Sequence, residues 1–149
     1  MEAQKEASVW PRVFVARNTG DDRFSVVVKN SGVGPALIEH VEVRVDGNII
    51  KTWNDATDII APNMSISKGQ SILTNYVLLP GETIVPIRLQ DEVANLFNVD
   101  RKRVRLKICY CSIYEKCWVI DEAVKRTAGF ATPYPVETCE IDVELQFLQ

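Results

Sequence analysis

Residues 24–47 constrain the fold of this chain more than any other stretch of the sequence. Along residues 24–29, Phe24, Val26 and Val28 share one face of a strand, with Ser25 and Lys29 on the other. Hydrophobic and polar side chains alternate again along residues 41–46, and a turn rich in glycine and proline separates the two runs. Because alternation with a period of two puts one set of side chains on each face of a strand, the pattern indicates an antiparallel sheet with one side in water. Asp46-Gly47 is a strong signal for a tight β-hairpin turn. The stretch therefore predicts the opening of an antiparallel β-sandwich.

The same alternation recurs along most of the remaining chain. Strands are expected at residues 12–16, 71–79, 85–89, 101–114, 117–120 and 138–147, and short helices at residues 54–60 and 91–97. A chain of 149 residues with 46% hydrophobic residues can form one domain with a substantial core. The sequence predicts an all-β fold for residues 10–149, a sandwich of about seven to nine strands with one or two short helices, after a polar lead-in at residues 1–9.

Several turns and hairpins resemble those of a known family. NSGVGPALIEHVEVRVDG at residues 30–47 and LLPGETIVPIRL at residues 78–89 are similar to bacterial immunoglobulin-like modules related to cell-adhesion domains. ASVWPRVFV at residues 7–15 and YCSIYEKCW at residues 110–118 resemble uncharacterised bacterial membrane-anchored proteins that carry such a domain outside the cytoplasmic membrane. The resemblance implies an immunoglobulin-like β-sandwich in an extracytoplasmic compartment, tethered to the membrane through its N-terminus, and it supplies no catalytic residues.

Charge and hydropathy argue against several classes of function. The chain has 17 Lys and Arg residues against 20 Asp and Glu residues, a net charge of −3, which argues against a dedicated nucleic-acid binder. No apolar run approaches the ~20 residues needed to span a bilayer, and the polar start MEAQKEAS lacks the apolar core of a signal peptide. Two explanations stay open: a cytoplasmic protein, or a chain from which an upstream membrane anchor has been trimmed. The resemblance favours the second.

The sequence also lacks the motifs of common enzyme sites. It contains no phosphate-binding loop, no nucleophile elbow and no HExxH zinc motif. The single histidine, His40, falls on the predicted solvent face between Glu39 and Val41. Acid–base catalysis would need a nucleophile or carboxylate that converges on the histidine, and we expect none there. We therefore expect no enzymatic activity and no cofactor.

A hairpin near residues 110–118 carries the distinctive chemistry of the chain. A turn centred on Tyr114 places Cys111 opposite Cys117 and, in the same register, Tyr110 opposite Trp118. One register thus pairs sulfur with sulfur and core residue with core residue, which supports it. The hairpin therefore predicts a disulfide between Cys111 and Cys117, a bond typical of an oxidising compartment.

The two remaining cysteines leave alternatives open. Cys109 and Cys139 are a possible second disulfide, although the alternation puts Cys109 on the polar face of its strand and Cys139 in line with core residues. A zinc site of all four thiolates is the other interpretation. Zinc-binding cysteines are usually separated by two to four residues in a tight turn, whereas one residue separates Cys109 and Cys111 and both lie within a predicted strand. We expect no metal site.

A basic cluster precedes the cysteine hairpin. Its members, which are the candidate binding residues, are Arg101, Lys102, Arg103, Arg105 and Lys107. One interpretation is a patch for phosphate or lipid headgroups. The interpretation we favour is a solvated strand face whose charges pair with the acidic residues of the expected last strand, because opposite charges directly across two strands stabilise a sheet. Those acidic residues are Glu140, Asp142 and Glu144.

The three tryptophans, Trp10, Trp53 and Trp118, are expected in the core or at its rim, with a platform for a sugar or a protein partner as the alternative. Taken together, the sequence and the resemblance predict a non-catalytic extracytoplasmic binding or scaffolding module of a membrane-anchored bacterial protein. Its partner is expected to be a protein rather than a nucleic acid, with membrane contact only through an anchor absent from this chain. The alternative is a cytoplasmic regulatory or protein-interaction module with reduced cysteines and a structural zinc site.

Overall fold

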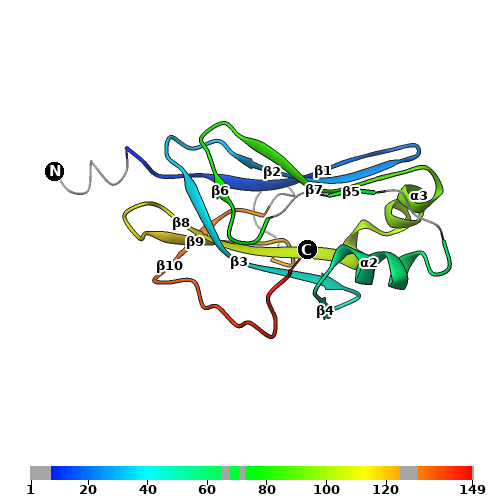
Figure 1. The fold of residues 1–149 in the computed structure, drawn as a ribbon. Coiled ribbons are helices and arrows are strands. Elements are labelled where there is room, and N and C mark those ends of the chain that lie inside the picture. The colour runs from blue at the N-terminus through cyan, green and yellow to red at the C-terminus, as the bar shows by residue number, and fades with distance from the viewer. Residues whose placement is uncertain (1–7, 65–67, 71–72, 125–130, 149) are drawn as a thin grey trace.

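The chain folds as two antiparallel β-sheets that face each other, with two short α-helices at one end (Figure 1). The computed structural model describes residues 8–64, 68–70, 73–124 and 131–148. Sheet A has the strand order β1 (Val13–Gly20), β2 (Arg23–Asn30), β7 (Thr83–Gln90) and β5 (Lys68–Gln70). Sheet B has the strand order β10 (Tyr134–Val136), β9 (Cys117–Asp121), β8 (Val104–Cys111), β3 (Ala36–Val45) and β4 (Asn48–Ile50), and β6 (Val77–Leu78) also pairs with β3. The all-β sandwich expected from the sequence is confirmed.

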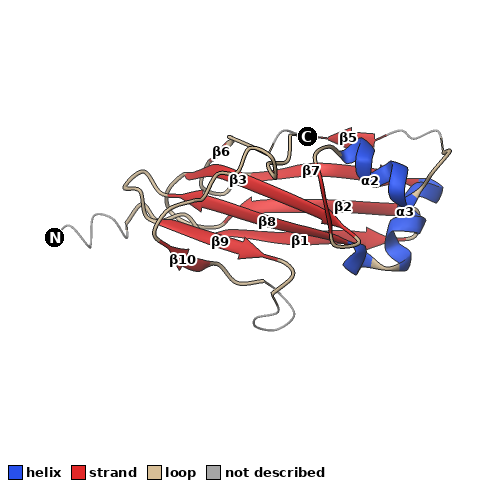
Figure 2. Ribbon diagram, turned by 90° about the horizontal axis from the view of Figure 1, so that it is seen from below, coloured by secondary structure: helices blue, strands red, loops and turns tan. Residues whose placement is uncertain are grey.

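The described residues contain ten strands, slightly more than expected, because β4, β5, β6 and β10 are strands of only two or three residues. Helix α2 (Trp53–Ile60) and helix α3 (Asp91–Val99) lie at the end of the sandwich away from the N-terminus (Figure 2). A 3-10 turn, η1 (Arg101–Arg103), leads from α3 into β8.

Residues 24–47 supply one strand to each sheet. The core-facing side chains are almost completely buried, namely Phe24, Val26 and Val28 of β2 and Val41, Val43 and Val45 of β3. Strand β2 pairs with β1 and β7, whereas β3 pairs with β8, so the turn between β2 and β3 carries the chain from sheet A to sheet B. The hairpin turn Asp46-Gly47 is confirmed, with φ of 52° and 83°, and it joins β3 to β4.

The glycines of the β2–β3 turn are required by a close approach of two chain segments. A Cβ atom on Gly32 would lie 2.4 Å from the backbone nitrogen of Arg12, and one on Gly34 would lie 1.8 Å from the carbonyl oxygen of Val9. Any larger residue at either position would therefore collide with backbone of the N-terminal segment. Neither glycine has a positive φ, so both are needed here for space and not for a left-handed backbone conformation.

The side chain of Asn30 holds this turn together. It is fully buried, and its amide oxygen accepts hydrogen bonds from the backbone nitrogens of Arg12 (3.1 Å) and Gly32 (2.9 Å). Its Nδ2 donates to the carbonyl oxygens of Gly34 (2.8 Å) and Leu78 (3.0 Å). One side chain thus joins β2, the start of β1, the β2–β3 turn and β6.

Several predicted boundaries are wrong. Helix α2 begins one residue earlier than expected, and its N-cap is Thr52, whose side chain accepts a hydrogen bond from the backbone nitrogen of Asp55. The strand expected at residues 101–114 is shorter at both ends, because Asp100 caps the turn η1 and β8 begins at Val104. In the strand expected at residues 71–79, residues 71 and 72 lie outside the described part of the chain, and only β6 forms within the rest.

The strand expected at residues 138–147 is also wrong. Residues 137–148 instead form an irregular segment, here called the C-terminal strap, which crosses the outer face of sheet B (Figure 1). Asp142 interrupts the alternating pattern, because its carbonyl accepts a hydrogen bond from Leu145 N (3.0 Å) and its side chain accepts one from Glu144 N (3.0 Å). Ile141 and Val143, which the alternation of a strand at residues 138–147 would place inside, are exposed.

The end of the strap is anchored along β3. The backbone nitrogen of Phe147 donates to the carbonyl of Val41 (2.8 Å), and the side chain of Gln146 accepts a hydrogen bond from Val41 N (3.1 Å). These contacts fill the stretch of the β3 edge between its pairings with β6 and β4. The ring of Phe147 is buried against Trp53, with 4.9 Å between ring centroids. The strap is therefore part of the core at this end.

Candidate functional site

Four cysteines from three elements meet on the outer face of sheet B. Cys111 of β8 and Cys117 of β9 lie directly opposite each other with their Sγ atoms 2.06 Å apart, and Cys109 lies 2.02 Å from Cys139 of the strap. The predicted pair, Cys111–Cys117, and the pair left open, Cys109–Cys139, thus both lie at disulfide distance. The predicted hairpin register is present, because Cys111 faces Cys117 in the β8–β9 ladder.

The strap explains why the alternation pattern disagreed with the second pair. Cys109 lies on the outer face of β8, as predicted, but Cys139 does not belong to a strand. The strap brings Cys139 across the sheet to the outer face. Because the strap is not a strand, the alternation of its residues does not predict which way Cys139 points. This bond and the buried Phe147 fix the strap at two points.

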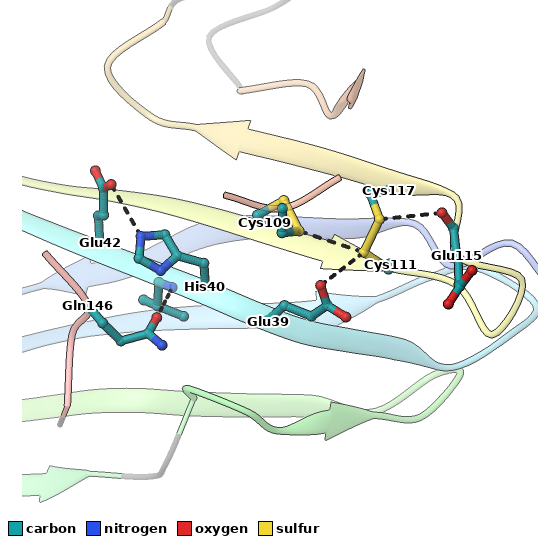
Figure 3. Close-up of a disulfide and its surroundings, with 10 residues drawn as sticks. Glu39, His40, Glu42, Cys109, Cys111, Glu115, Cys117 and Gln146 are labelled. Carbon is teal, nitrogen blue, oxygen red and sulfur yellow. Dashed lines mark hydrogen bonds and ion pairs between the residues drawn. A yellow bond between two sulfur atoms is a disulfide. The ribbon is translucent and has the colours of Figure 1, made fainter. Parts of the chain in front are cut away.

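The two disulfides touch each other. The Sγ atom of Cys111 lies 3.6 Å from that of Cys139, although these two cysteines are not bonded (Figure 3). The sulfurs of Cys111, Cys117 and Cys139 all lie within 4.8 Å of one another. A carboxylate oxygen of Glu39 lies 3.4 Å from the Cys111 sulfur. The cysteines therefore form one sulfur cluster rather than two independent bonds.

A cavity of about 430 Å³ lies next to this cluster, between the outer face of sheet B and the strap. Cys109, His40 and Glu42 form part of its floor, and Glu140 and Asp142 of the strap form part of its cover. The cavity is thus lined by both polar and apolar groups, with carboxylates on both sides.

The expectation that His40 is a surface residue is wrong. The phase was right, because His40 does point to the outer face of β3, but the strap covers that face and leaves the residue 5% exposed. Its Nε2 lies 3.3 Å from a carboxylate oxygen of Glu42 (Figure 3), so the expectation that no carboxylate converges on His40 is also wrong. Its Nδ1 is buried and has no hydrogen-bond partner among the described residues.

An apolar groove of about 850 Å³ lies on the other side of the cluster. The indole rings of Trp10 and Trp118 meet edge to face with 5.6 Å between centroids, and Pro135 and Val136 of β10 extend the apolar surface. Trp10 is 42% exposed. Cys117 also lines the groove, so the hairpin disulfide borders it directly.

The tryptophans therefore divide into two kinds. Trp53 is buried in the core, as expected, whereas Trp10 and Trp118 lie at the rim. Trp118 stacks on Tyr110 of the adjacent strand with 5.7 Å between centroids. The hydroxyl of Tyr110 accepts a hydrogen bond from Val13 N (3.3 Å), and burial raises the pKa of this phenol to about 12. The buried Tyr110 thus holds the ring of Trp118 in place beneath the groove.

The basic cluster does not form one patch. Arg103 makes a two-bond ion pair with Asp46 (2.7 and 2.8 Å), which lowers the pKa of the Asp46 carboxyl. Lys107 lines the cavity beneath the strap. The remaining three members border a shallow hollow of about 390 Å³ beside β1, and they are Arg101, Lys102 and Arg105.

The expected charge ladder between the basic cluster and Glu140, Asp142 and Glu144 is wrong, because those acidic residues lie in the strap and not in a strand. In the β8 ladders, Lys107 faces Glu42 on β3 and Asp121 on β9. Lys107 is therefore opposite acidic residues of β3 and β9, and not opposite those of the expected last strand.

An inward ion pair was missed by the sequence analysis. Arg17 of β1 contacts Glu122 at 2.6 Å and donates to the carbonyl of Val104 at 2.6 Å, and both charged side chains are about nine-tenths buried. The signal was present, because Arg17 follows Val13 and Val15 in the inward phase of β1. A charge that points inward on an edge strand discourages pairing with another chain.

Comparison of the chain with known protein families, with curated proteins and with solved structures finds no match. Among the described residues, no helix has the length and apolar character needed to cross a bilayer. Three features of the described residues are candidates for function: the sulfur cluster, the cavity beneath the strap and the groove of Trp10 and Trp118.

Proposed function

We propose that the chain is a non-catalytic, extracytoplasmic binding module that contacts a protein partner through the groove of Trp10 and Trp118. The observation that carries this proposal is the exposed aromatic floor of the groove beside the Cys111–Cys117 bond. Tryptophan is enriched at protein interfaces, where it often supplies much of the binding energy. A cross-linked hairpin also loses little conformational freedom when a partner binds.

The chemistry of the groove selects an extended, proline-containing peptide segment with a basic residue. Proline-rich segments dock in aromatic-lined grooves because their extended conformation is formed before binding. The charged residues at the groove are Glu115, Lys116 and Glu137, so acidic groups are in excess. A basic side chain next to the prolines would complement that charge.

The extracytoplasmic location is supported by the two cysteine pairs at disulfide distance, because such bonds persist in oxidising compartments and are rare in the cytosol. The immunoglobulin-like family and the N-terminal membrane tether, which the sequence resemblance implies, belong to the same proposal.

A peptide titration tests the groove. The probe is a blocked nine-residue polyproline peptide with two arginines, and the matched peptide carries two glutamates instead. We expect saturable binding of the basic peptide, followed by tryptophan fluorescence and by NMR shifts, and at least tenfold weaker binding after Trp10→Ala. Val99→Ala, at an exposed residue of α3 at the other end of the sandwich, is the control and should bind as the wild type does.

Two results would count against the groove. Equal binding of the basic peptide by the Trp10→Ala and wild-type proteins would show that the groove is not the binding site. Saturable binding of a neutral oligosaccharide such as cellohexaose, without binding of the peptide, would show that the aromatic surface recognises sugars rather than a protein.

A second candidate function is favoured by one observation. Three cysteine sulfurs lie within 4.8 Å of one another, which is close enough for thiolates to share a zinc ion. In that case the chain would be a cytoplasmic regulatory or protein-interaction module with reduced cysteines. Metal analysis of protein purified without chelator separates the two candidates, because stoichiometric zinc together with free thiols would support the second one only.

A further inference from the structure

We propose that the sulfur cluster is a thiol–disulfide exchange site, which accepts two electrons from a dithiol reductant and passes the reduced state from Cys111–Cys117 to Cys109. The observation behind it is the non-bonded distance of 3.6 Å between the sulfurs of Cys111 and Cys139, which belong to different disulfides. Disulfide exchange requires a thiolate to approach a disulfide sulfur, and this pair is already in van der Waals contact.

The first half of the reaction is reduction of the hairpin bond by a dithiol, such as a protein with a C-x-x-C motif. A thiolate of the dithiol attacks the sulfur of Cys117, which is reached from the apolar groove, and Cys111 leaves as a thiolate. The second thiol of the reductant then attacks its own sulfur in the mixed disulfide and releases Cys117. The reductant becomes a disulfide, and two electrons have entered the cluster.

The second half is internal. The thiolate of Cys111 attacks the sulfur of Cys139, a bond forms between these two residues, and Cys109 leaves as a thiolate. The two protons that the dithiol gives up end on Cys117 and Cys109. The protein thus exchanges two disulfides for one disulfide and two thiols, and neither metal nor oxygen is needed to balance the step.

The movement that this exchange needs is small. The 3.6 Å between the two sulfurs must shorten to the ~2.05 Å of a disulfide, a shift of about 1.5 Å. Cys109 and Cys111 point to the same face of β8 and lie about 7 Å apart along it, at ~3.3 Å per residue. The far end of the strap stays fixed by Phe147.

Exchange therefore has a structural consequence. Cys139 stays bonded to β8 in both states, so the strap is never released. Its partner changes from Cys109, in the floor of the cavity, to Cys111, in the hairpin. Reduction thereby leaves a free thiol on Cys109 in the cavity beneath the strap and another on Cys117 at the groove of Trp10 and Trp118. A change in the redox state of the sulfur cluster would thus alter both the cavity beneath the strap and the groove of Trp10 and Trp118.

The variant Cys117→Ser tests the internal step without any reductant. It leaves three cysteines, of which Cys139 can pair with either Cys109 or Cys111. The oxidised full chain is equilibrated at mildly alkaline pH, trapped with N-ethylmaleimide at mildly acid pH, where exchange slows, and analysed by tandem mass spectrometry. We expect label on both Cys109 and Cys111, with Cys109 carrying no less than about a tenth of it, as for pairings within a tenfold equilibrium constant. Label on Cys111 alone would overturn the proposal.

Two further variants act as matched controls. Cys111→Ser keeps a free thiol on the same hairpin but removes the sulfur at 3.6 Å, so label should stay on Cys117. If Cys111→Ser labels Cys109 as strongly as Cys117→Ser does, the contact is irrelevant and the proposal fails. Cys109→Ser tests the same contact from the other side, because its free Cys139 should attack Cys111 and divide the label between Cys139 and Cys117. It carries the test by itself if Cys117→Ser does not fold, and label on Cys139 alone would refute exchange.

Discussion

Replacement of Asn30 by alanine is expected to destabilise the fold strongly. The buried amide makes four hydrogen bonds to backbone groups, and the alanine leaves all four of those groups without their partner. At ~1 kcal/mol net for each bond, the loss is about 4 kcal/mol. Typical domains have 5–15 kcal/mol in total, so this is a large fraction, and it corresponds to a fall of roughly 10 °C in Tm for a chain of this length.

Urea unfolding of the oxidised protein, followed by far-UV circular dichroism, measures this loss directly. Asn48→Ala is the control, because Asn48 is an exposed asparagine in the short strand β4, and it should change the free energy of unfolding by no more than ~0.5 kcal/mol. A loss below ~1 kcal/mol for Asn30→Ala, with an unchanged dependence on urea, would show that the turn does not depend on this side chain.

Asn30→Asp tests the same hydrogen bonds through the pH dependence of stability. A carboxylate at this buried position still accepts the two N–H groups, but it faces the carbonyls of Gly34 and Leu78 that the amide donates to. Burial and these carbonyls raise the pKa of the new carboxyl above that in the unfolded chain. The variant should therefore be most stable in acid and lose stability as the pH rises from about 4 to about 7, whereas wild-type stability should not follow that course.

Two other predictions concern Tyr110 and the disulfides. Because burial raises the pKa of Tyr110 to about 12, this phenol stays protonated in the folded chain when it ionises in the unfolded one. Stability is therefore expected to fall between about pH 10 and pH 12, by up to ~3 kcal/mol, and urea unfolding should show a smaller fall for Tyr110→Phe. Loss of the Cys109–Cys139 bond, which closes 30 residues, should cost about 4 kcal/mol, against about 2 kcal/mol for Cys111–Cys117, which closes six. Double serine variants measure both losses, and equal losses would contradict the loop-closure argument.

Local patterns in the sequence were enough to predict most of the sandwich. Alternation identified the inward faces of β2 and β3, and a turn centred on Tyr114 gave the register that places Cys111 opposite Cys117. The Asp46-Gly47 turn was also found, because its positive φ angles demand particular residues. These features depend on neighbours a few residues away, which a sequence displays directly.

The strap could not be predicted in the same way. Its residues 141–147 alternate as a strand would, but Asp142 turns the chain, and only the end of the strap bonds to β3, at Val41. The burial of His40 follows from the strap, so the histidine was assigned to solvent although its phase was right. The role of Gly32 and Gly34 was missed because the segment they admit lies some twenty residues away in the sequence.

The thiol state of the protein in its own cells tests the central claim most directly. Free thiols are blocked with N-ethylmaleimide as the cells are opened, and the isolated chain is then analysed by mass spectrometry before and after reduction. An oxidised extracytoplasmic module predicts no label on any of the four cysteines and two bonds, Cys109–Cys139 and Cys111–Cys117. Label on all four cysteines would contradict the account and would place the chain in a reducing compartment.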